Sequence, residues 1–472
     1  MAPEKKVFYK KLFALVLPIA FQNFMLSLVS ASDAFMLGRL NQNAMSAVSL
    51  AGQVMFVFHL FLGSMTIGAS IFVAQYYGKK DMRAVERFTG LVMGPTFIVS
   101  LLMTALSAFC PRLLMKIWTS DPELIELGAG YLRVVSLNYL LTGVTEIFLC
   151  VLKNTDRAKK SSLISSGAVV INIVLNAILI FGLLGFPAMG IAGAALATVI
   201  SRAISFLLVL PDFFHAKRVP TEGDAAVVSE IPLAKTISFH LSDVLHVDPL
   251  DRKDFWKPVT PIVANMFVWG LGFSMGTVIM GRLGQDAIAA NSIASVAKSL
   301  TFCFCQGIGA GAGIMVGHEL GAGKLDTAKL YGHMLCISSI VGAVITDIVL
   351  ISLTPVLLKV ADLTPAAQAY LPWMLVVNAL NILGGSLNST TISGIFTAGG
   401  DSKFGLKCDI ITLWFIIVPA GLLSAFVLKW PVLVVYLIVN LDEIVKLPAV
   451  WVNYHKYNWV KDLTRDASEP ST

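Results

Sequence analysis

The amino-acid sequence predicts an all-α polytopic membrane protein, with twelve transmembrane helices in two six-helix lobes related by a parallel internal repeat. Three observations lead to this fold class. Hydrophobic residues make up 56% of the 472 residues and charged residues only 14%, against about 25% in soluble domains. The apolar residues gather in segments of the length needed to cross a bilayer, about 20 residues each. The first half of the chain also matches the second half at a constant offset.

Charged and Gly/Pro-rich breaks divide the chain into twelve apolar segments. They lie near residues 12–38, 44–77, 88–110, 128–152, 161–184, 187–214, 257–281, 287–317, 328–354, 366–397, 404–428 and 431–455. The one extended polar stretch separates six spans from six. We therefore expect an N-lobe over residues 1–215, a cytoplasmic inter-lobe loop over residues 216–256, and a C-lobe with a short cytoplasmic tail over residues 257–472.

The basic residues indicate the orientation in the membrane. Of the 35 Lys and Arg residues, 25 fall in the termini and loops on the N-terminal side of the spans, and 6 fall on the opposite side. Because excess positive charge stays in the cytoplasm, both termini are expected there, in a multi-pass protein of the plasma (inner) membrane. The net charge of +6 is thus explained by short loops in contact with a lipid bilayer, and no nucleic-acid partner is expected.

The internal repeat is clearest between residues 18–78 and 261–321, which align without a gap at an offset of 243 residues with 18 identities in 61 positions. Shared apolar composition would not reproduce the polar pairing of Gly38-Arg39-Leu40 with Gly281-Arg282-Leu283. Six spans are an even number, so both copies enter the membrane in the same direction. Two lobes related in this way leave a cleft that can open to either face, an arrangement typical of transporters.

Several motifs resemble those of the multidrug and toxic compound extrusion (MATE) exporters of bacterial type. They are Leu17-Pro18, Asp33 ahead of Gly38-Arg39-Leu40, Ala69-Ser70, Gln75-Tyr76-Tyr77-Gly78, residues 190–198, and Ala398-Gly399-Gly400-Asp401. The resemblance implies a secondary active antiporter that exports amphipathic or cationic organic compounds in exchange for Na⁺ or H⁺, by alternating access of a cleft between two lobes. It implies no cofactor beyond the coupling ion and a small-molecule substrate, and we expect a monomer.

Asp33 is the leading candidate for cation coupling. A charged side chain within the bilayer costs from about 3 to more than 10 kcal/mol, so an acid there needs a function or a partner. Burial favours its neutral or cation-bound state, whereas the alternative is a carboxylate hydrogen-bonded to a nearby serine. Pro18, fifteen residues earlier in the same predicted helix, permits a bend, and in similar exporters the first helix bends with the protonation state. No metal site is expected beyond Na⁺ at Asp33.

Other polar residues are expected beside Asp33. Asn172 and Asn176 are i, i+4 neighbours and share one helical face, where their amide oxygens suit Na⁺ or a hydrogen bond to Asp33. Related exporters often carry Asn and Asp at this spacing, so Asn176 is one carboxylate fewer. The resemblance places the hydroxyl of Thr198 in the same pocket. Glu146 could supply the missing charge or lie at the membrane interface.

The second half departs from the first at this site, because Gly276 stands at the repeat position of Asp33. A second carboxylate site of the same kind is therefore not expected. The remaining candidate polar sites are Asp347 and Asp409, with Arg202 as a counter-charge facing the cleft. Lys446 is expected to be neutralised by an acid one helical turn earlier, at Asp442 or Glu443, in a structural role.

Two other functions are weighed against export. A flippase for a lipid-linked precursor, within the same superfamily, would favour a strongly cationic cleft, but only four Lys and Arg residues lie within the spans. An intramembrane enzyme would need a catalytic motif. The chain has no His-Glu-x-x-His, no Gly-x-Ser-x-Gly and no phosphate-binding loop followed by Lys-Ser/Thr, so no enzyme is expected. A loop signature at residues 78–83 resembles that of major-facilitator transporters, but its repeat partner lacks the acid.

Overall fold

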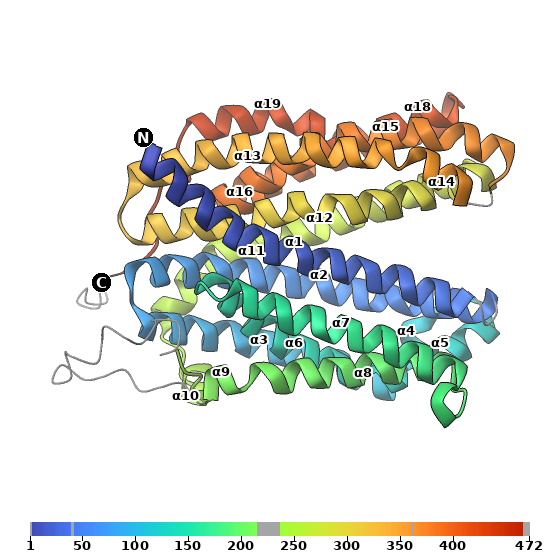
Figure 1. The fold of residues 1–472 in the computed structure, drawn as a ribbon, viewed down its shortest axis with the longest axis horizontal. Coiled ribbons are helices and arrows are strands. Elements are labelled where there is room, and N and C mark those ends of the chain that lie inside the picture. Colours follow the sequence, from blue (N-terminus) through green and yellow to red (C-terminus); the bar gives the residue numbers. More distant parts are fainter. Residues whose placement is uncertain (1, 39–41, 215–236, 361–362, 466–472) are drawn as a thin grey trace. The chain divides into compact units, whose positions relative to one another are not determined.

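The computed structural model describes residues 2–38, 42–214, 237–360 and 363–465. Across these ranges every regular element is a helix (Figure 1). Ten of the described helices are long and apolar enough to cross a membrane, and a bent pair of helices brings the number of spans to eleven. The predicted all-α polytopic fold is therefore confirmed. In the motif Gly38-Arg39-Leu40, the last two residues lie outside the described residues.

The helices of the first half follow the six predicted spans, with short additions at the span ends. They are α1 (Ala2–Gly38), α2 (Gln42–Lys79), α3 (Met82–Phe109), α4 (Pro111–Lys116), α5 (Pro122–Val135), α6 (Leu137–Asn154), α7 (Ala158–Phe181), η1 (Leu183–Gly185), α8 (Gly190–Val209) and α9 (Pro211–Phe214). The fourth predicted span is not straight, because α5 and α6 meet at a bend of 48°.

The helices of the second half are more often broken. They are α10 (Leu241–Leu245), α11 (Pro249–Gly281), α12 (Gln285–Gly321), α13 (Leu325–Ser352), α14 (Thr354–Val360), α15 (Pro365–Asn388), η3 (Ser389–Phe396), α16 (Ser402–Asp409), η4 (Ile410–Ile417), α17 (Val418–Leu422), η5 (Leu423–Val427), α18 (Val432–Val439) and α19 (Asp442–His455). The elements η3, η4 and η5 are π-helical and continue the tenth and eleventh spans. The twelfth predicted span is formed by α18 and α19, each too short to cross a membrane alone.

The described residues form two compact units. Unit 1 holds the described residues among 2–24 and 256–465, and unit 2 holds those among 25–255. The unit boundary cuts α1 after Phe24, so its first part packs with the helices of the second half. The lobe boundaries drawn from the span count stay a prediction. The contact units differ from them by this exchange of the beginning of α1.

The predicted loop over residues 216–256 is wrong in its last part. Residues 215–236 lie outside the described residues, but α10 and the start of α11 occupy most of the remainder. A helix begins within this charged stretch. Pro249 is the first residue of α11, and Asp251 lies in its first turn. Both residue types favour a helix N-terminus, proline through its fixed φ and aspartate through the helix dipole.

In unit 1, small residues bring α1 close to α12. A Cβ atom added to Gly307 would lie 3.0 Å from Cβ of Ala20 and 3.1 Å from the carbonyl oxygen of Val16, and one added to Gly311 would lie 3.1 Å from a methyl group of Val16. Such small-residue contacts are typical of helix packing in membranes. Pro18 lies between these two α1 residues, so its bend point is held against the glycine face of α12.

In unit 2, α7 and α8 lie side by side (Figure 1) and pack along their length. A Cβ atom added to Gly193 of α8 would lie 2.6 Å from the carbonyl oxygen of Leu179 on α7, closer than real Cβ atoms come. Only glycine permits this approach. The close contact brings the polar faces of α7 and α8 together and so positions the candidate site.

Candidate ion-coupling site

Asp33 lies near the end of α1, in the part of the helix that belongs to unit 2, and is partly buried. Its side-chain oxygen Oδ1 accepts a hydrogen bond of 2.6 Å from Nδ2 of Asn176 on α7. This contact joins two helices whose residues are 143 positions apart in the sequence. The carboxylate is therefore held by a donor from another span.

The hydrogen bonds continue from Asn176 to α8. Nδ2 of Asn176 also donates to Oδ1 of Asn172 at 3.1 Å, and Nδ2 of Asn172 lies 3.4 Å from Oγ1 of Thr198 and 3.5 Å from Oγ of Ser201. Both asparagine side chains are buried, with relative exposures of 6% for Asn172 and 1% for Asn176. Four residues named from the sequence thus form one chain of polar contacts across α1, α7 and α8.

Ser201 is the member of this polar chain that sequence reasoning missed. It is buried at 3% exposure, and its hydroxyl donates to the carbonyl oxygen of Thr198 at 2.9 Å. The signal available was its spacing, because Ser201 follows Thr198 by three positions and so shares its helical face. A serine in a helix of small residues gives no further indication of its partner.

One oxygen atom in this chain of polar contacts, Oδ1 of Asn176, is free to bind a ligand. Oδ1 of Asn176 is buried and has no hydrogen-bond partner among the described residues. Buried polar groups in proteins are satisfied in the large majority of cases, so an orphaned acceptor beside a carboxylate needs an explanation. Carboxylate, amide and hydroxyl oxygens are the ligands that hard cations prefer. The same oxygen can accept a hydrogen bond from a protonated carboxyl group.

Glu146 and Arg202 form a separate pair. Oε1 of Glu146 on α6 lies 3.7 Å from Nη1 of Arg202 on α8, and both side chains are mostly buried, at 18% and 20% exposure. Among the described contacts, Glu146 pairs with Arg202 and not with Asp33 or its asparagines. Arg202 follows Thr198 by one helical turn, so the ion pair and the polar chain meet the same face of α8.

The second half assembles a different polar cluster, in unit 1. The ammonium group of Lys446 lies 2.6 Å from Asp409, 3.2 Å from Glu443 and 3.8 Å from Asp442. The pairing with one-turn neighbours was predicted, but the shortest contact, to Asp409, was not. Nδ2 of Asn388 also donates to Glu443 at 2.8 Å. A lysine therefore occupies the centre of these carboxylates.

The remaining predicted residues of the second half stand apart from this cluster. Asp347 lies on α13 with Oδ1 buried and without a hydrogen-bond partner among the described residues. Gly276, the repeat position of Asp33, faces α18, where an added Cβ atom would lie 3.2 Å from a methyl group of Val439. A carboxylate side chain at position 276 would have to displace this valine.

Comparisons with known proteins agree with this architecture. Residues 18–178 and 261–423 match the MatE family model, and the two stretches begin 243 residues apart, at the offset of the internal repeat. The uncharacterized transporter YisQ of Bacillus subtilis is 21% identical over 465 residues, covering 98% of this chain and 93% of the relative. The probable multidrug resistance protein NorM of Bradyrhizobium diazoefficiens is 27% identical over 406 residues, covering 84% of this chain and 82% of the relative.

Solved structures show the same fold at low sequence identity. A crystal structure of a mutant of the Vibrio cholerae MATE transporter VcmN superposes with a TM-score of 0.83 at 16% identity, covering 98% of this chain and 99% of that chain. An outward-facing multidrug resistance MATE family transporter of the MOP superfamily superposes with a TM-score of 0.79 at 17% identity, covering 95% and 96%. The twelve-helix, two-lobe fold class predicted from the sequence is consistent with both structures.

Proposed function

This chain belongs to the MatE family of transporters, and from this premise we propose that it is a secondary active antiporter that exports amphipathic or cationic organic compounds in exchange for Na⁺ or H⁺. Its relatives include proteins described as multidrug resistance proteins. The observation that carries the coupling part of the proposal is the hydrogen bond between Asn176 and Asp33, beside an unpaired buried oxygen.

The polar chain offers a way to respond to the coupling ion. An ionised Asp33 accepts the hydrogen bond from Asn176, as in the structure. A protonated carboxyl group donates as well, and the free Oδ1 of Asn176 is the adjacent acceptor. If the amide turned over so that Oδ1 accepted a hydrogen bond from this carboxyl group, the present bond from Asn176 to Asn172 would be lost. Ion loading would then change contacts on both α7 and α8.

A bound Na⁺ would use the same atoms differently. The carboxylate of Asp33 and the free Oδ1 of Asn176 would then supply oxygen ligands to the ion. Either ion neutralises Asp33 in an environment where an uncompensated charge is costly. A difference of a few kcal/mol between two helix arrangements is enough to shift their populations.

Pro18 gives α1 a place to bend in response. Proline removes the hydrogen bond that Ala14 would otherwise accept. The residues before the unit boundary at Phe24 pack with unit 1, and those after it pack with unit 2. A change at Asp33 is thereby expected to alter the angle of α1 at a point where the helix is already weakened.

The flippase alternative finds less support in the described residues. Its strongly cationic cleft would need several free basic groups within the spans. Of the four Lys and Arg residues there, Arg202 is paired with Glu146 and Lys446 with Asp409, which leaves two. An enzymatic function is not proposed, since the relatives are transporters.

Dye export from reconstituted vesicles tests the proposed function. The purified protein would be placed in liposomes loaded with a fluorescent organic cation, and either an inward Na⁺ gradient or an inward proton gradient would be imposed. We expect one of the two gradients to accelerate export relative to protein-free liposomes. Equal rates with and without each gradient would contradict antiport.

A further inference from the structure

The polar residues at the start of α3 lie on one helical face. Arg83, Glu86, Arg87 and Gly90 follow one another at spacings of three, one and three, which places them on the same side of the helix. Arg83 is the last residue of the loop signature at residues 78–83, and none of these residues belongs to the candidate ion-coupling site. The segment that packs on this face lies about 150 residues later in the chain and was predicted to be a loop.

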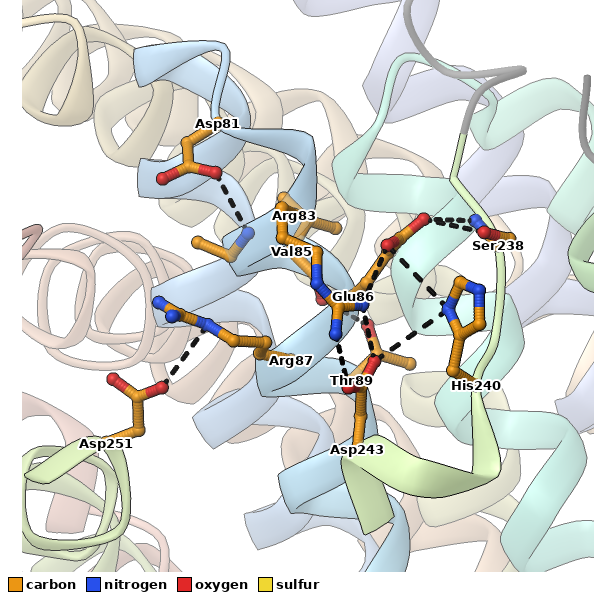
Figure 2. Close-up of polar contacts among 11 residues, drawn as sticks. Asp81, Arg83, Val85, Glu86, Arg87, Thr89, Ser238, His240, Asp243 and Asp251 are labelled. Atoms are coloured by element: carbon orange, nitrogen blue, oxygen red, sulfur yellow. Dashed lines mark hydrogen bonds and ion pairs between the residues drawn. The ribbon is translucent and has the colours of Figure 1, made fainter. Parts of the chain in front are cut away.

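Glu86 and Arg83 hold this later segment by hydrogen bonds and ion pairs (Figure 2). Oε1 of Glu86 accepts from the backbone N–H of Ser238 at 2.6 Å and from its hydroxyl at 2.8 Å. The guanidinium group of Arg83 donates to both carboxylate oxygens of Asp243, at 2.8 and 2.7 Å. Such bidentate pairs fix geometry as well as adding energy. His240 lies 3.8 Å from Glu86 and 3.9 Å from Asp243.

The acids of this network are buried, although they lie near the end of a helix. Glu86 has a relative exposure of 9% and Asp243 of 7%, whereas Arg83 is half-exposed. A Cβ atom added to Gly90 would lie 2.7 Å from the backbone carbon of Asp243. The segment therefore approaches α3 so closely that only glycine fits beneath it. The segment is therefore packed tightly against α3.

Aromatic side chains attach the segment to other helices of unit 2. The ring of Phe239 lies 5.3 Å from that of Phe148 on α6 and 5.9 Å from that of Phe214 on α9. Its backbone N–H donates to the carbonyl oxygen of Phe213 at 2.9 Å. The segment is thus attached to α6 and α9 as well as to α3.

The same attachment continues into the first turns of α11. Arg87 of α3 lies 3.4 Å from the carboxylate of Asp251 (Figure 2). Phe255 is fully buried, and its ring lies 5.8 Å from that of Phe72 on α2. Unit 2 ends at this residue. Contacts to unit 2 therefore recur from the start of the described segment to the point where α11 leaves that unit.

We propose that residues 237–255 are a strap that positions the start of α11 on α3, and that transport requires the strap to remain docked throughout the cycle. Release of the strap would break the hydrogen bonds from Arg83 to Asp243 and from Ser238 to Glu86, so these contacts oppose it. Arg83 and Glu86 are then positioning residues for transport, although they lie outside the ion-coupling site. The inference rests on the proposed export activity.

A disulfide across the contact tests whether the strap stays docked. A Cβ atom on Gly94 would lie 3.8 Å from a methyl group of Val244, so the pair Gly94→Cys and Val244→Cys is within reach of a disulfide after small adjustments. Cys110, the exposed native cysteine, would be replaced by serine. We expect the oxidised protein to be cross-linked and to export dye within about twofold of its reduced form. Export that stops on oxidation and returns on reduction would overturn the proposal, as would a failure to cross-link.

The substitution Arg83→Ala in the same background tests whether docking is needed. It leaves Asp243 buried without its bidentate partner, so we expect reduced protein to lose roughly tenfold or more of its export rate. Oxidation should restore most of that rate, because the disulfide replaces the lost attachment. Unchanged export in the reduced Arg83→Ala variant would refute the proposal. Export that stays low after cross-linking would refute it too.

Two further controls keep the results separate. Arg112→Ala removes one member of an exposed ion pair with Glu126 and should leave export unchanged. Cross-linking is read from the protein itself, by electrophoresis or mass, and does not depend on transport. If the parent protein cross-links but exports no dye, the proposed function fails and the strap geometry stands. If it exports but does not cross-link, the strap fails and the function stands.

Discussion

Nδ2 of Asn176 donates a hydrogen bond of 2.6 Å to Oδ1 of Asp33, so a helix of the fifth predicted span fixes the side chain of an acid on the first. The donor is itself 1% exposed and keeps its own oxygen unpaired. The acid, the buried donor and the free acceptor lie at one place. Their hydrogen bonds can therefore differ between an ionised Asp33 and an Asp33 that has bound a proton or a cation. The predictions below start from this relationship.

Asn176→Asp should strengthen ion loading. Two carboxylates at hydrogen-bond distance cannot both ionise easily, so they would share a proton or a cation. We expect half-maximal export at a lower Na⁺ concentration if Na⁺ is the coupling ion, or export that persists to higher pH if it is H⁺. Titration of the export rate against each ion checks this. Asn176→Leu, which can neither donate nor accept, should weaken coupling; if both variants behave like the parent, position 176 does not contribute.

Gly193→Ala should separate the polar faces of α7 and α8. The added Cβ atom would lie 2.6 Å from the carbonyl oxygen of Leu179, a backbone atom that cannot move alone. Overpacking of this kind costs about 1–3 kcal/mol and should pull Asn172 away from Thr198. Thermal unfolding in detergent measures the loss. Gly167→Ala on α7 is the matched control, because nothing lies within 4 Å of its added Cβ atom. Equal stability of the two variants would contradict the close helix contact.

Lys446→Met should destabilise the protein far more than removal of an exposed lysine. The Lys446 side chain is 3% exposed, and its ammonium group lies among three carboxylates, including Asp409 at 2.6 Å. Removing one partner of a buried ion pair costs about 3–5 kcal/mol. Lys329→Met breaks a pair with Asp326 whose members are 43% and 98% exposed, and exposed pairs contribute about 0–1 kcal/mol. The two thermal unfolding curves should differ clearly, and overlapping curves would show that the cluster does not need its lysine.

Ser242→Cys tests the orientation predicted from the basic residues. We expect both termini and residue 242 to face the cytoplasm, because 25 of the Lys and Arg residues lie on that side and 6 on the other. An impermeant thiol reagent added to intact cells should therefore label the native, exposed Cys110 but not residue 242 until the cells are opened. Labelling of residue 242 in intact cells would reverse the orientation.

The sequence predicted well what depends on local spacing. The i, i+4 relation of Asn172 and Asn176 placed them on one face of α7, and the cost of an intramembrane acid singled out Asp33. The repeat at an offset of 243 residues anticipated the two stretches that match the family model. Helix-forming apolar segments and their periodicity are properties of short windows of sequence, which is why these placements could be predicted. The role of Asp33 in coupling stays a prediction.

Partner choice between distant segments was not accessible in this way. Asp409 and Lys446 are 37 positions apart, and tertiary packing alone brings them together. The local spacing indicated only that Lys446 could pair with acids one turn earlier. The start of α11 at Pro249 was missed because its first turns are charged and look like a loop. Pro249 and Asp251 were the local signals of a helix start, whereas the contact of Phe255 with Phe72 on α2 could not be read from a local pattern.

Asp33→Asn measures the central claim most directly. The substitution keeps the size and much of the hydrogen bonding of the side chain but removes its charge, so folding and some substrate binding should be retained. Asp347→Asn is the matched control, since Asp347 is another acid within a predicted span but lies on α13 in unit 1, whereas the polar chain of Asp33 belongs to unit 2. In vesicles with an imposed Na⁺ or proton gradient, we expect Asp33→Asn to abolish ion-driven dye export and Asp347→Asn to preserve it. Export by Asp33→Asn at the parental rate under both gradients would contradict the claim that Asp33 is the coupling residue.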